Sequence, residues 1–303
     1  MILFISKGGV FVNSWMKSIP DDFVLSEINI PGTNDSATKK VDFSYFSKCQ
    51  NTTISEQLNM GARFIDIRVK KTGDKLILVH GSAKCRNPAS DKELLFLDEV
   101  ISDCEKFLLE NPSEAIIFSI KRDAGATEEE TFDVFFQEYL DSSFWYLENR
   151  IPTIGEVRGK IVLFNRMCVD IENEQYNDYN TGLNFSGWPD QSKPTNFPFV
   201  TSLIARRDGR SPERFFYQDM YRLSRKDKWN LGVFPLLEEP VSDFGIVLNF
   251  FSASDIIHSP KCYSKYMAKR FSKVDLMPFT KYGWLIFDFC SEKLCRKVVL
   301  TNF

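Results

Sequence analysis

The stretch VLSEINIPGTNDSATKK, residues 24–40, contains the pattern that decides the fold. Residues 24–30 are predicted to form a buried strand that ends at Pro31-Gly32-Thr33, because Pro and Gly interrupt regular structure. A polar pair, Asn34 and Asp35, follows directly where the strand meets a loop. Loops held at the ends of rigid strands are common places for functional residues. The same arrangement recurs along the chain.

Other short apolar segments have the composition of strands: 62–69, 76–81, 115–121, 160–166, 214–221, 245–251 and 284–290. Strands that alternate with helical patterns predict parallel strands joined by helical crossovers. Together with 24–30 they make eight, which in a chain of 303 residues predicts a distorted (β/α)8 TIM barrel of α/β class. We expect one domain over residues 1–303, irregular between 70 and 76, where no helix is evident.

Two of the intervening helices have clear start signals. Residues 90–110 begin with Ser90 and Glu93 at the spacing of a capping box, followed by an apolar face that Asn111-Pro112 ends. Thr127 and Glu130 have the same spacing and predict a second helix that runs to about residue 140.

The composition excludes several classes of protein. At 43% hydrophobic and 26% charged residues the chain is globular, and its net charge of -3 offers no basic surface for nucleic acid. The cysteines at 49, 85, 104, 168, 262, 290 and 295 include no C-x-x-C pair, and the chain has only two histidines. This pattern argues against a structural zinc site or a disulfide framework and is typical of buried thiols in a reducing compartment.

The ends and the hydropathy predict a soluble protein, and we expect it to be a monomer. The apolar start MILFI is too short for a signal-peptide core, and no run approaches the ~18 apolar residues of a membrane-spanning helix. The sequence as written predicts a cytoplasmic protein, or a secreted one if a signal has been removed.

Polar residues fall at or near the ends of nearly all the predicted strands: Asn34 and Asp35, Asp66 and Arg68, His80, Lys121, Arg166, Asp219, Asn249 and Ser252, and Asp288. In a parallel barrel all the carboxyl ends open on one face, so these side chains should converge on one pocket. For Asn249 or Ser252 alone a structural role is favoured. For the charged set a functional role is favoured, because buried ions are rare unless they are paired or functional.

The chemistry of this set points to a phosphodiester that carries a hydroxylated ring. Cationic side chains suit phosphate and polyol oxygens, and carboxylates accept hydrogen bonds from hydroxyls or orient a histidine. His80 has the one unperturbed pKa of the set near neutrality. His258 is placed in a predicted helix and is expected to be structural.

At these residues the sequence resembles the X domain of phosphatidylinositol-specific phospholipase C. The ordered motifs are NSWMKSIPDDFVLSEINIPGTNDS, QNTTISEQLNMGARFIDIRV, LVHG, FLLENPSEAIIFSIKRD and GKIVLFNR. Later segments, YQDMY, GIVLNFFSAS and WLIFDF, resemble the C-terminal half of the bacterial single-domain enzymes, so the likeness covers about residues 13–290. It implies a distorted TIM barrel and a lyase-type cleavage. The ring 2-hydroxyl attacks phosphorus, diacylglycerol leaves, and cyclic inositol 1,2-phosphate forms.

The resemblance also implies roles for individual residues. His80 would be the general acid, assisted by Asp35, and Asp288 would orient the general base. Arg68 would hold a phosphate oxygen beside Asp66. The inositol ring would contact Lys121, Arg166, Asp219 and Tyr221, although Tyr221 could equally be a packed strand aromatic. No catalytic metal or other cofactor is expected, because Arg68 stands in the region where calcium-dependent relatives place carboxylates.

One position departs from the family pattern. The family motif has histidine, the general base, where this chain has Asn34 in PGTND. An amide cannot take a proton at neutral pH, and general-base catalysis is worth roughly 10²–10⁴ in rate. Three explanations stay open: a weakened or inactive natural relative, a deliberate replacement, or a substitute base such as Asp288 or Asp35.

Two other functions compete with cleavage of the lipid. A catalytically silent module would bind inositol phosphates or inositol lipids without turnover. A glycerophosphodiester phosphodiesterase shares the barrel, but those enzymes use a metal-binding set near the first strand, where this chain has Asn34 and Asp35. The substrate also predicts transient membrane contact. Trp188 and residues 195–199 could dip into the bilayer, although a lid that packs on itself is favoured.

Overall fold

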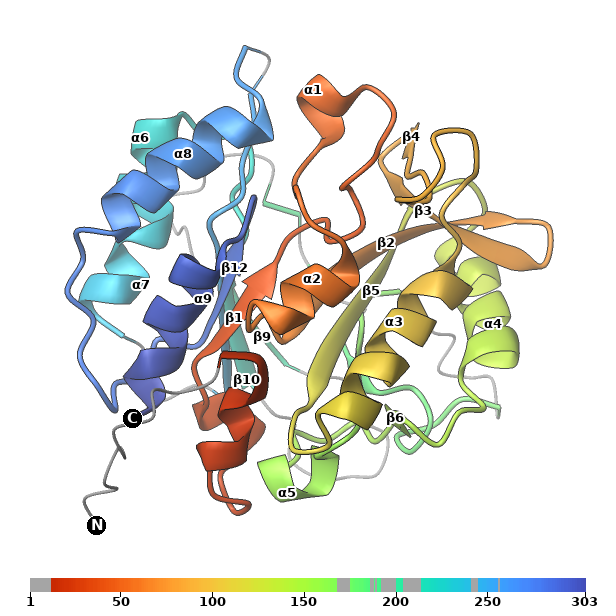
Figure 1. The fold of residues 1–303 in the computed structure, drawn as a ribbon, viewed down its shortest axis with the longest axis horizontal. Helices are drawn as coiled ribbons and strands as arrows, with labels where there is room; N and C mark the ends of the chain where they lie inside the picture. Colours follow the sequence, from red (N-terminus) through yellow and green to blue (C-terminus); the bar gives the residue numbers. More distant parts are fainter. Residues whose placement is uncertain are drawn as a thin grey trace.

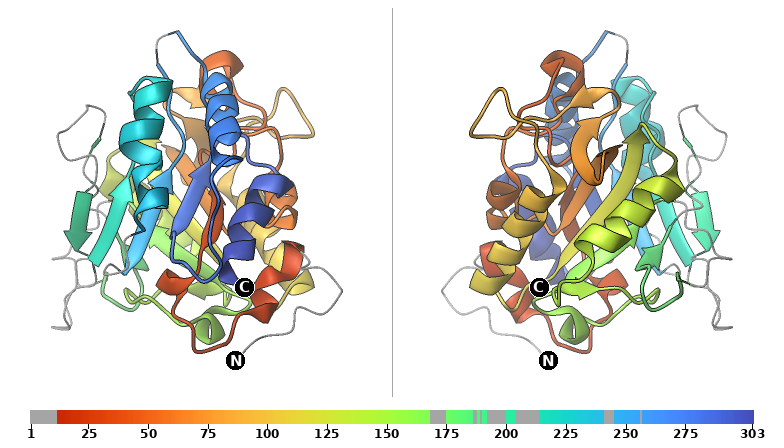
Figure 2. Two further views of the ribbon diagram at one scale, coloured as in Figure 1. Left: turned by 90° about the vertical axis from the view of Figure 1, so that its left-hand side faces the viewer. Right: turned by 90° about the vertical axis from the view of Figure 1, so that its right-hand side faces the viewer.

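The computed structural model describes residues 12–167, 175–185, 188, 190–191, 200–203, 214–240, 245–255 and 257–303. A curled sheet forms the centre of the molecule, and helices lie on its outside (Figures 1 and 2). Within these residues, no helix has the length and apolar character needed to cross a membrane.

The strands, in chain order, are β1 (Ile30–Thr33), β2 (Phe64–Thr72), β3 (Lys75–His80), β4 (Ala83–Lys84), β5 (Ile116–Ala124), β6 (Trp145–Tyr146), β7 (Ile161–Asn165), β8 (Leu183–Asn184), β9 (Val200–Leu203), β10 (Arg214–Gln218), β11 (Ile246–Phe250) and β12 (Trp284–Phe287). Their order in the sheet is β6-β7-β5-β2-β1-β12-β11-β10-β9. Neighbours from β6 to β10 are parallel, whereas β9 is antiparallel to β10.

The helices are η1 (Val12–Ser18), η2 (Leu25–Glu27), α1 (Ser44–Ser47), α2 (Ile54–Asn59), α3 (Leu97–Glu110), α4 (Glu128–Tyr139), α5 (Ile154–Val157), α6 (Arg225–Asp227), η3 (Lys228–Val233, a π-helix), α7 (Pro235–Glu238), α8 (Pro260–Phe271), α9 (Glu292–Val299) and η4 (Leu300–Asn302). Outside the curled sheet, α7–α9 lie at the left of the view and α3 and α4 at the right (Figure 1).

The prediction of a distorted barrel is confirmed, and side chains help to complete it where strands do not pair. β8 pairs with β7, and Phe185 and Trp188, which follow β8, contact side chains of β10. The rings of Phe185 and Phe215 lie 4.5 Å apart, and those of Trp188 and Tyr217 lie 4.0 Å apart. Aromatic packing therefore bridges the sheet between β8 and β10.

The predicted first strand was misplaced. Residues 25–27 form the 3₁₀ helix η2, and Pro31-Gly32-Thr33 lie inside β1 instead of ending it. A Cβ added at Gly32 would lie 2.7 Å from Ile286 and 2.8 Å from the Cβ of Phe64. Gly32 is therefore needed because β1 packs tightly inside the barrel, and it does not mark a turn.

The segment 76–81 is also not a parallel barrel strand. β3 is antiparallel to β2, with Thr72 opposite Lys75 across a tight turn at Gly73 (φ +60°). This hairpin explains the missing helix between residues 70 and 76, because antiparallel neighbours need no crossover. β6 takes a place in the parallel order that the sequence analysis did not foresee.

The two predicted helix starts had different outcomes. Thr127 caps α4 as expected, because its Oγ1 accepts from Glu130 N (3.1 Å) and Glu130 Oε2 accepts from Thr127 N (2.9 Å). The helix placed at 90–110 begins only at Leu97, so the capping box at Ser90 and Glu93 was wrong. Short β-bridges hold the chain before Leu97, with Arg86 opposite Leu94 and Ile77 opposite Phe96.

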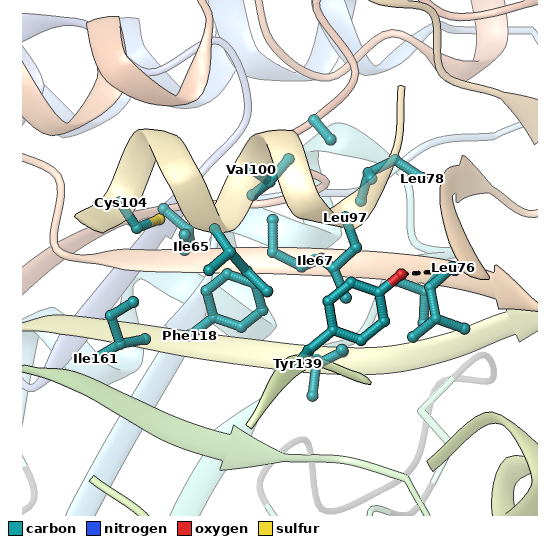
Figure 3. Close-up of a cluster of buried hydrophobic side chains, with 14 of the residues drawn as sticks. Ile65, Ile67, Leu76, Leu78, Leu97, Val100, Cys104, Phe118, Tyr139 and Ile161 are labelled. Carbon is teal, nitrogen blue, oxygen red and sulfur yellow. Dashed lines mark hydrogen bonds between the residues drawn. The ribbon is translucent and has the colours of Figure 1, made fainter. Parts of the chain in front are cut away.

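Three apolar clusters build the core. One fills the barrel interior, where Phe64, Phe164 and Trp284 are in mutual ring contact. A second lies between β2, β3 and β5 and the helices α2 to α4, with Ile65, Ile67 and Phe118 facing Leu97, Val100 and Cys104 (Figure 3). The third joins β12 and the segment after β11 to α7, α8 and α9.

A buried ion pair lies at the amino-terminal end of β2 and β5. Arg63 Nε and Nη2 donate to Glu114 Oε2 at 3.0 and 2.8 Å. The remaining guanidinium donors bind the carbonyl oxygens of Leu58, Ala62 and Asn13. Both charged side chains are fully buried, and the pair fixes the start of two neighbouring strands.

Candidate active site

A polar pocket of about 460 Å³ opens at the carboxyl ends of the parallel strands. Nearly all the residues predicted for the site line it: Asn34, Asp35, Arg68, His80, Lys121, Arg166, Asp219, Tyr221 and Asp288. Asp66 lies beneath them, fully buried. The parallel arrangement thus gathers side chains that are spread over some 250 residues of sequence.

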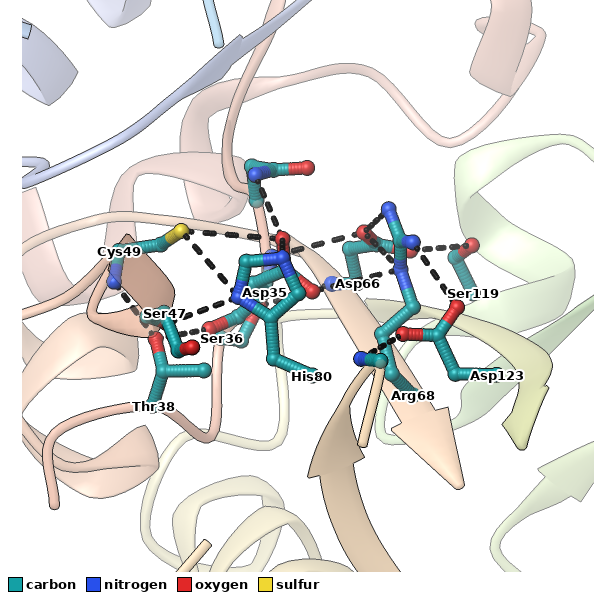
Figure 4. A network of polar contacts seen from close by, with 12 residues as sticks. Asp35, Ser36, Thr38, Ser47, Cys49, Asp66, Arg68, His80, Ser119 and Asp123 are labelled. Atoms are coloured by element: carbon teal, nitrogen blue, oxygen red, sulfur yellow. Dashed lines mark hydrogen bonds and ion pairs between the residues drawn. The ribbon is translucent and has the colours of Figure 1, made fainter. Parts of the chain in front are cut away.

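The alternation of β2 and β5 explains why so many polar groups share one face. Asp66 and Arg68 are two residues apart on β2, and Ser119 and Lys121 occupy the matching positions of β5. Successive side chains of a strand point to opposite faces, so this spacing of two places all four on the same side. Asp123 continues the row, and Figure 4 shows it beside Arg68.

Arg68 is surrounded by carboxylates. Its Nε and Nη2 both lie 3.0 Å from Asp66 Oδ2, and its Nε and Nη1 lie 3.4 Å from Asp35 and Asp123 respectively. Burial raises the pKa of Asp66, but Arg68 and Arg166 outweigh it and the pKa is lowered. Burial likewise raises the pKa of Asp123, but Arg68 and the Gly81 N–H overcome it and lower the value to about 2. Arg68 is therefore a fixed, fully charged cation at the pocket wall.

Asn34 joins two carboxylates at the end of β1. Its Nδ2 donates to Asp288 Oδ1 at 2.9 Å and to Asp35 Oδ2 at 3.0 Å. The expectation that Asp288 lies beside residue 34 is therefore met. Both amide protons are used, so the amide oxygen of Asn34 is left to accept from a ligand hydroxyl. Gln50 fixes the backbone here, because its Nε2 donates to the carbonyls of Asn34 and Phe287.

Asp288 is the carboxyl group of the pocket with the clearest tendency to hold a proton. Burial and the neighbouring charge of Asp35 raise its pKa to about 7, against an opposing hydrogen bond from Asn34. A carboxylate that titrates near neutrality can exchange protons at physiological pH. Asp288 can therefore accept a proton near neutral pH, which the amide of Asn34 cannot do.

His80 projects from the end of β3 toward Asp35. Its Nδ1 lies 2.8 Å from the carbonyl oxygen of Ser47, which can only accept, so Nδ1 carries a proton. Its Nε2 lies 3.6 Å from Asp35 Oδ2. The negative charge of Asp35 raises the pKa of His80 above its usual value against the opposing effect of burial. His80 is thereby oriented as a proton donor, and its raised pKa favours the protonated form.

Arg166 and Lys121 supply the positive charge on the far side of the pocket. Arg166 lies 3.4 Å from Asp66 and 3.9 Å from Asp219, and its guanidinium stacks 4.0 Å from the ring of Trp188. Burial, aided by the charges of Arg68 and Arg166, lowers the pKa of Lys121. No carboxylate among the described residues lies within ion-pair distance of Lys121, so its ammonium group can meet an anionic or hydroxylated ligand.

The C-terminal strands contribute Asp219, Tyr221 and Ser252 to the lining. Burial raises the pKa of Asp219, against the neighbouring charge of Arg166. The Tyr221 hydroxyl donates to Asp190 at 2.7 Å. Asn249 has the structural role that was favoured for it, because it accepts from Gln218 and donates to the carbonyl of Val233.

Two further expectations concern residues near the pocket. His258 does not lie in a helix. It precedes α8, and its Nδ1 lies 2.8 Å from Asp255, so it holds a loop. Trp188 packs on Phe164, Phe215 and Tyr217, which agrees with the packed-lid interpretation for this residue. Residues 195–199, like Cys168, lie outside the described residues.

Sequence reasoning missed three polar groups of the site. Asp123 could have been found from the alternation Ser119-x-Lys121-x-Asp123, because every second residue of a strand shares a face. Cys49, which lines the pocket beside Asp35, carries no local signal. Lys228 is fully buried in η3, donates to Gln218 Oε1 at 2.6 Å, and burial lowers its pKa to about 7. Its charge opposes those of Asp219 and Asp288.

Comparison with known proteins supplies relatives for this fold and pocket. Residues 19–167 match the family described as phosphatidylinositol-specific phospholipase C, X domain. The 1-phosphatidylinositol phosphodiesterase of Staphylococcus aureus strain Newman is 29% identical over 294 aligned residues, covering 91% of this chain and 88% of that protein. The protein of the same name from Listeria monocytogenes is 25% identical over 316 aligned residues, covering 98% of this chain and 87% of that protein.

Solved structures show the same fold. A structure of the S. aureus phosphatidylinositol-specific phospholipase C, from work on its membrane binding, superposes with a TM-score of 0.75 at 24% identity and covers 96% of this chain and 98% of its own. The phosphatidylinositol-specific phospholipase C of L. monocytogenes superposes with a TM-score of 0.67 at 23% identity, covering 97% and 100%. The match extends over the C-terminal half, beyond the residues of the family match.

Proposed function

Because the chain belongs, through residues 19–167, to the X-domain family of phosphatidylinositol-specific phospholipase C, we propose that it cleaves the phosphodiester bond of phosphatidylinositol. The products are diacylglycerol and cyclic inositol 1,2-phosphate. The observation that carries the proposal is the convergence of Arg68, His80 and the Asn34–Asp288 pair on one pocket. Those are the positions that the family motif marks as phosphate ligand, acid and base.

Each charged group of the pocket has a task in this reaction. Arg68, held by three carboxylates, binds a non-bridging phosphate oxygen and stabilises the charge that develops at phosphorus. The ring 2-hydroxyl attacks phosphorus and loses its proton. His80 gives its Nε2 proton to the departing diacylglycerol oxygen as the P–O bond breaks. The inositol hydroxyls are held by Arg166, Lys121 and Asp219, with Tyr221 against the ring.

Asp288 takes the proton from the 2-hydroxyl in place of the missing histidine. Its carboxyl lies 2.9 Å from the Asn34 amide, so a hydroxyl bound to the amide oxygen of Asn34 would lie within reach of Asp288. Burial raises the pKa of Asp288 to about 7, which suits a base at neutral pH. The position of Asp288 is nevertheless the one from which a partner would orient a base, so we expect slow cleavage.

Binding without turnover is the second candidate function, and Asn34 is the observation that favours it. The ligand-holding groups, Lys121, Arg166 and Asp219, do not depend on a base at position 34. Such a module would bind inositol phosphates with the same pocket. Measuring turnover and binding on one preparation separates the two functions.

The rim of the pocket offers a surface for membrane contact. Phe43, Tyr45 and Phe46, in and beside α1, are well exposed, and Phe43 is 77% exposed. The same helix ends at Ser47, whose carbonyl accepts from His80. Ile257, 74% exposed, belongs to the loop whose neighbours Ser254 and Pro260 line the pocket. Exposed aromatic and aliphatic side chains around a pocket mouth suit docking on a lipid surface.

Changing Asn34 to His tests the proposed function. The new imidazole would have Asp288 to orient it, and cleavage of phosphatidylinositol should rise by at least about 10² over the unmodified chain. The cyclic product should appear, and the reaction should continue with a chelator present. Asn59→His makes the same chemical change on the exposed face of α2 and should leave the rate unchanged.

The outcome also decides between the two functions. Release of linear inositol phosphate as the first product would contradict the proposed lyase chemistry. No gain in rate, combined with intact binding of inositol phosphate, would establish the binding module instead.

A further inference from the structure

Three side chains of different chemistry meet at the inner wall of the pocket. Asp35 follows β1, Cys49 lies in the loop between α1 and α2, and His80 ends β3 (Figure 4). One ligand atom of each lies within 4.8 Å of the others. All three line the pocket, and the cleavage reaction proposed above uses no thiol.

Their distances suit a small tetrahedral ion. Asp35 Oδ2 lies 3.6 Å from His80 Nε2 and 3.7 Å from Cys49 Sγ. Zinc binds oxygen and nitrogen at ~2.0–2.2 Å and sulfur at ~2.3 Å, so ligand atoms around it are separated by roughly 3.3–3.8 Å. Cys49 Sγ lies 3.9 Å from His80 Nδ1, so the Cys49 side chain must turn toward Nε2 to close the three ligand atoms around one ion.

The surroundings also favour a cation here. The Ser47 carbonyl accepts from His80 Nδ1, which leaves Nε2 as the ligand atom and supplies the outer hydrogen bond that metal-bound histidines usually make. Asp35 is buried, and its Oδ1 makes no hydrogen bond to any described residue, although Arg68 lies 3.4 Å away. Asp66 and Asp123 pair with Arg68, and their negative charge offsets its repulsion of a cation.

We propose that Asp35, Cys49 and His80 form a binding site for a thiophilic divalent cation of the zinc class, with a fourth position open to the pocket. Calcium and magnesium are excluded as occupants, because both prefer oxygen ligands and neither favours thiolate or imidazole. The cation displaces the thiol proton of Cys49 and the Nε2 proton of His80, and both protons pass to the solvent.

Occupation of this site switches off the acid. His80 Nε2 cannot hold a metal ion and a transferable proton at once, so bound zinc blocks protonation of the leaving group. This consequence rests on the proposed function, whereas metal binding itself does not. Zinc should therefore inhibit cleavage, and a chelator should restore it.

Metal titrations test the site without reference to activity. The reduced protein, titrated with Zn²⁺ against a chromophoric chelator, should bind one equivalent, and Co²⁺ should give a thiolate-to-cobalt charge-transfer band. Loss of an outer-shell partner already costs 10–100-fold in affinity, so Cys49→Ser should weaken Zn²⁺ binding at least about 100-fold and abolish the band. Cys262→Ser removes a more accessible thiol outside the pocket and should preserve both.

Because Cys49 is buried, Cys49→Ser could fail to fold, and a second variant at a more exposed ligand is therefore needed. His80→Asn removes a partly exposed ligand and should weaken Zn²⁺ binding to the same extent. The proposal is wrong if the folded protein binds no zinc, or if both ligand variants bind it with unchanged affinity. Inhibition by zinc that survives in Cys49→Ser would place the inhibitory ion elsewhere.

Discussion

Two arginines lie five residues apart, one just before β2 and one within it, and both bind carboxylates, but their surroundings differ. Arg63 precedes the strand at the closed end of the barrel, where one carboxylate and three backbone carbonyls take up its donors. Arg68 lies toward the open end, where three carboxylates surround it and a pocket adjoins it. The charge of Arg63 is balanced by one carboxylate and all its donors are used, whereas Arg68 and its three carboxylates together carry excess negative charge.

The difference separates a structural ion pair from a functional one. A saturated pair has no capacity left for a ligand, so its effect is confined to folding. An arginine held by surplus carboxylates faces a solvent-filled pocket and is positioned before a ligand arrives, which is the condition for stabilising developing charge. Arg63 is fully buried and the side chain of Arg68 is only 15% exposed, so low exposure alone does not identify the site.

The largest expected effect comes from breaking the closed-end pair. Arg63→Met keeps much of the side-chain volume against Phe107 but leaves Glu114 charged and unpaired, which should cost about 3–5 kcal/mol of unfolding free energy. Urea unfolding measures it. The double variant Arg63→Met, Glu114→Gln removes both charges and should recover most of the loss. If the single variant is as stable as the parent, the pair does not hold β2 and β5.

Breaking the open-end cluster should affect catalysis more than folding. In the Asn34→His background, Arg68→Gln should reduce cleavage by about 10²–10³, because one preorganised group at the developing charge is worth about that much. Its unfolding free energy should fall less than that of Arg63→Met, because Asp66 keeps its contacts with Arg166 and Ser119 and water can reach the partly exposed Asp123. In the same background, Arg63→Met should lose more unfolding free energy than Arg68→Gln and less cleavage activity. Equal losses of stability would show that Arg68 is also a structural residue.

The smallest effect concerns the pH dependence of stability. Burial raises the folded-state pKa of Asp288 to about 7 from its ordinary 3.8, so the folded state holds a proton that the unfolded state releases. Stability from this group is full below about pH 4 and is lost as the pH rises to about 7. Asp288→Asn should therefore gain roughly 2 kcal/mol relative to the parent between pH 5 and pH 8.

A control of opposite sign is available in Asp42. The hydrogen bond from Arg86 lowers the pKa of Asp42, so this group adds stability as the pH rises above its folded-state pKa. As the pH rises through the lower part of the acid range, the parent should gain stability that Asp42→Asn does not gain. A parallel response of the two variants would contradict the assigned direction for Asp288.

Much of the candidate site was predictable because its signals are local. Arg68, His80 and Asp288 each follow apolar residues in a segment of strand composition, and a parallel sheet brings such ends together without further information. Asp123 could have been predicted too, because it lies two residues after Lys121 and every second residue of a strand shares a face. The replacement of the family's histidine by Asn34 was also visible in the sequence, because the residues of the motif are adjacent in the chain.

The sequence by itself determined the class of fold, the α4 cap at Thr127 and the end of the barrel at which charge collects, since these depend on residues close together in the chain. Only the tertiary structure decided that Gly32 lies inside a strand, because that depends on contacts with Phe64 and Ile286. It alone also brought Cys49 to Asp35 and His80 and separated Arg63 from Arg68 in function. Side chains distant in sequence acquire their proton affinity and their partners from neighbours that the fold supplies, and no local pattern encodes those neighbours.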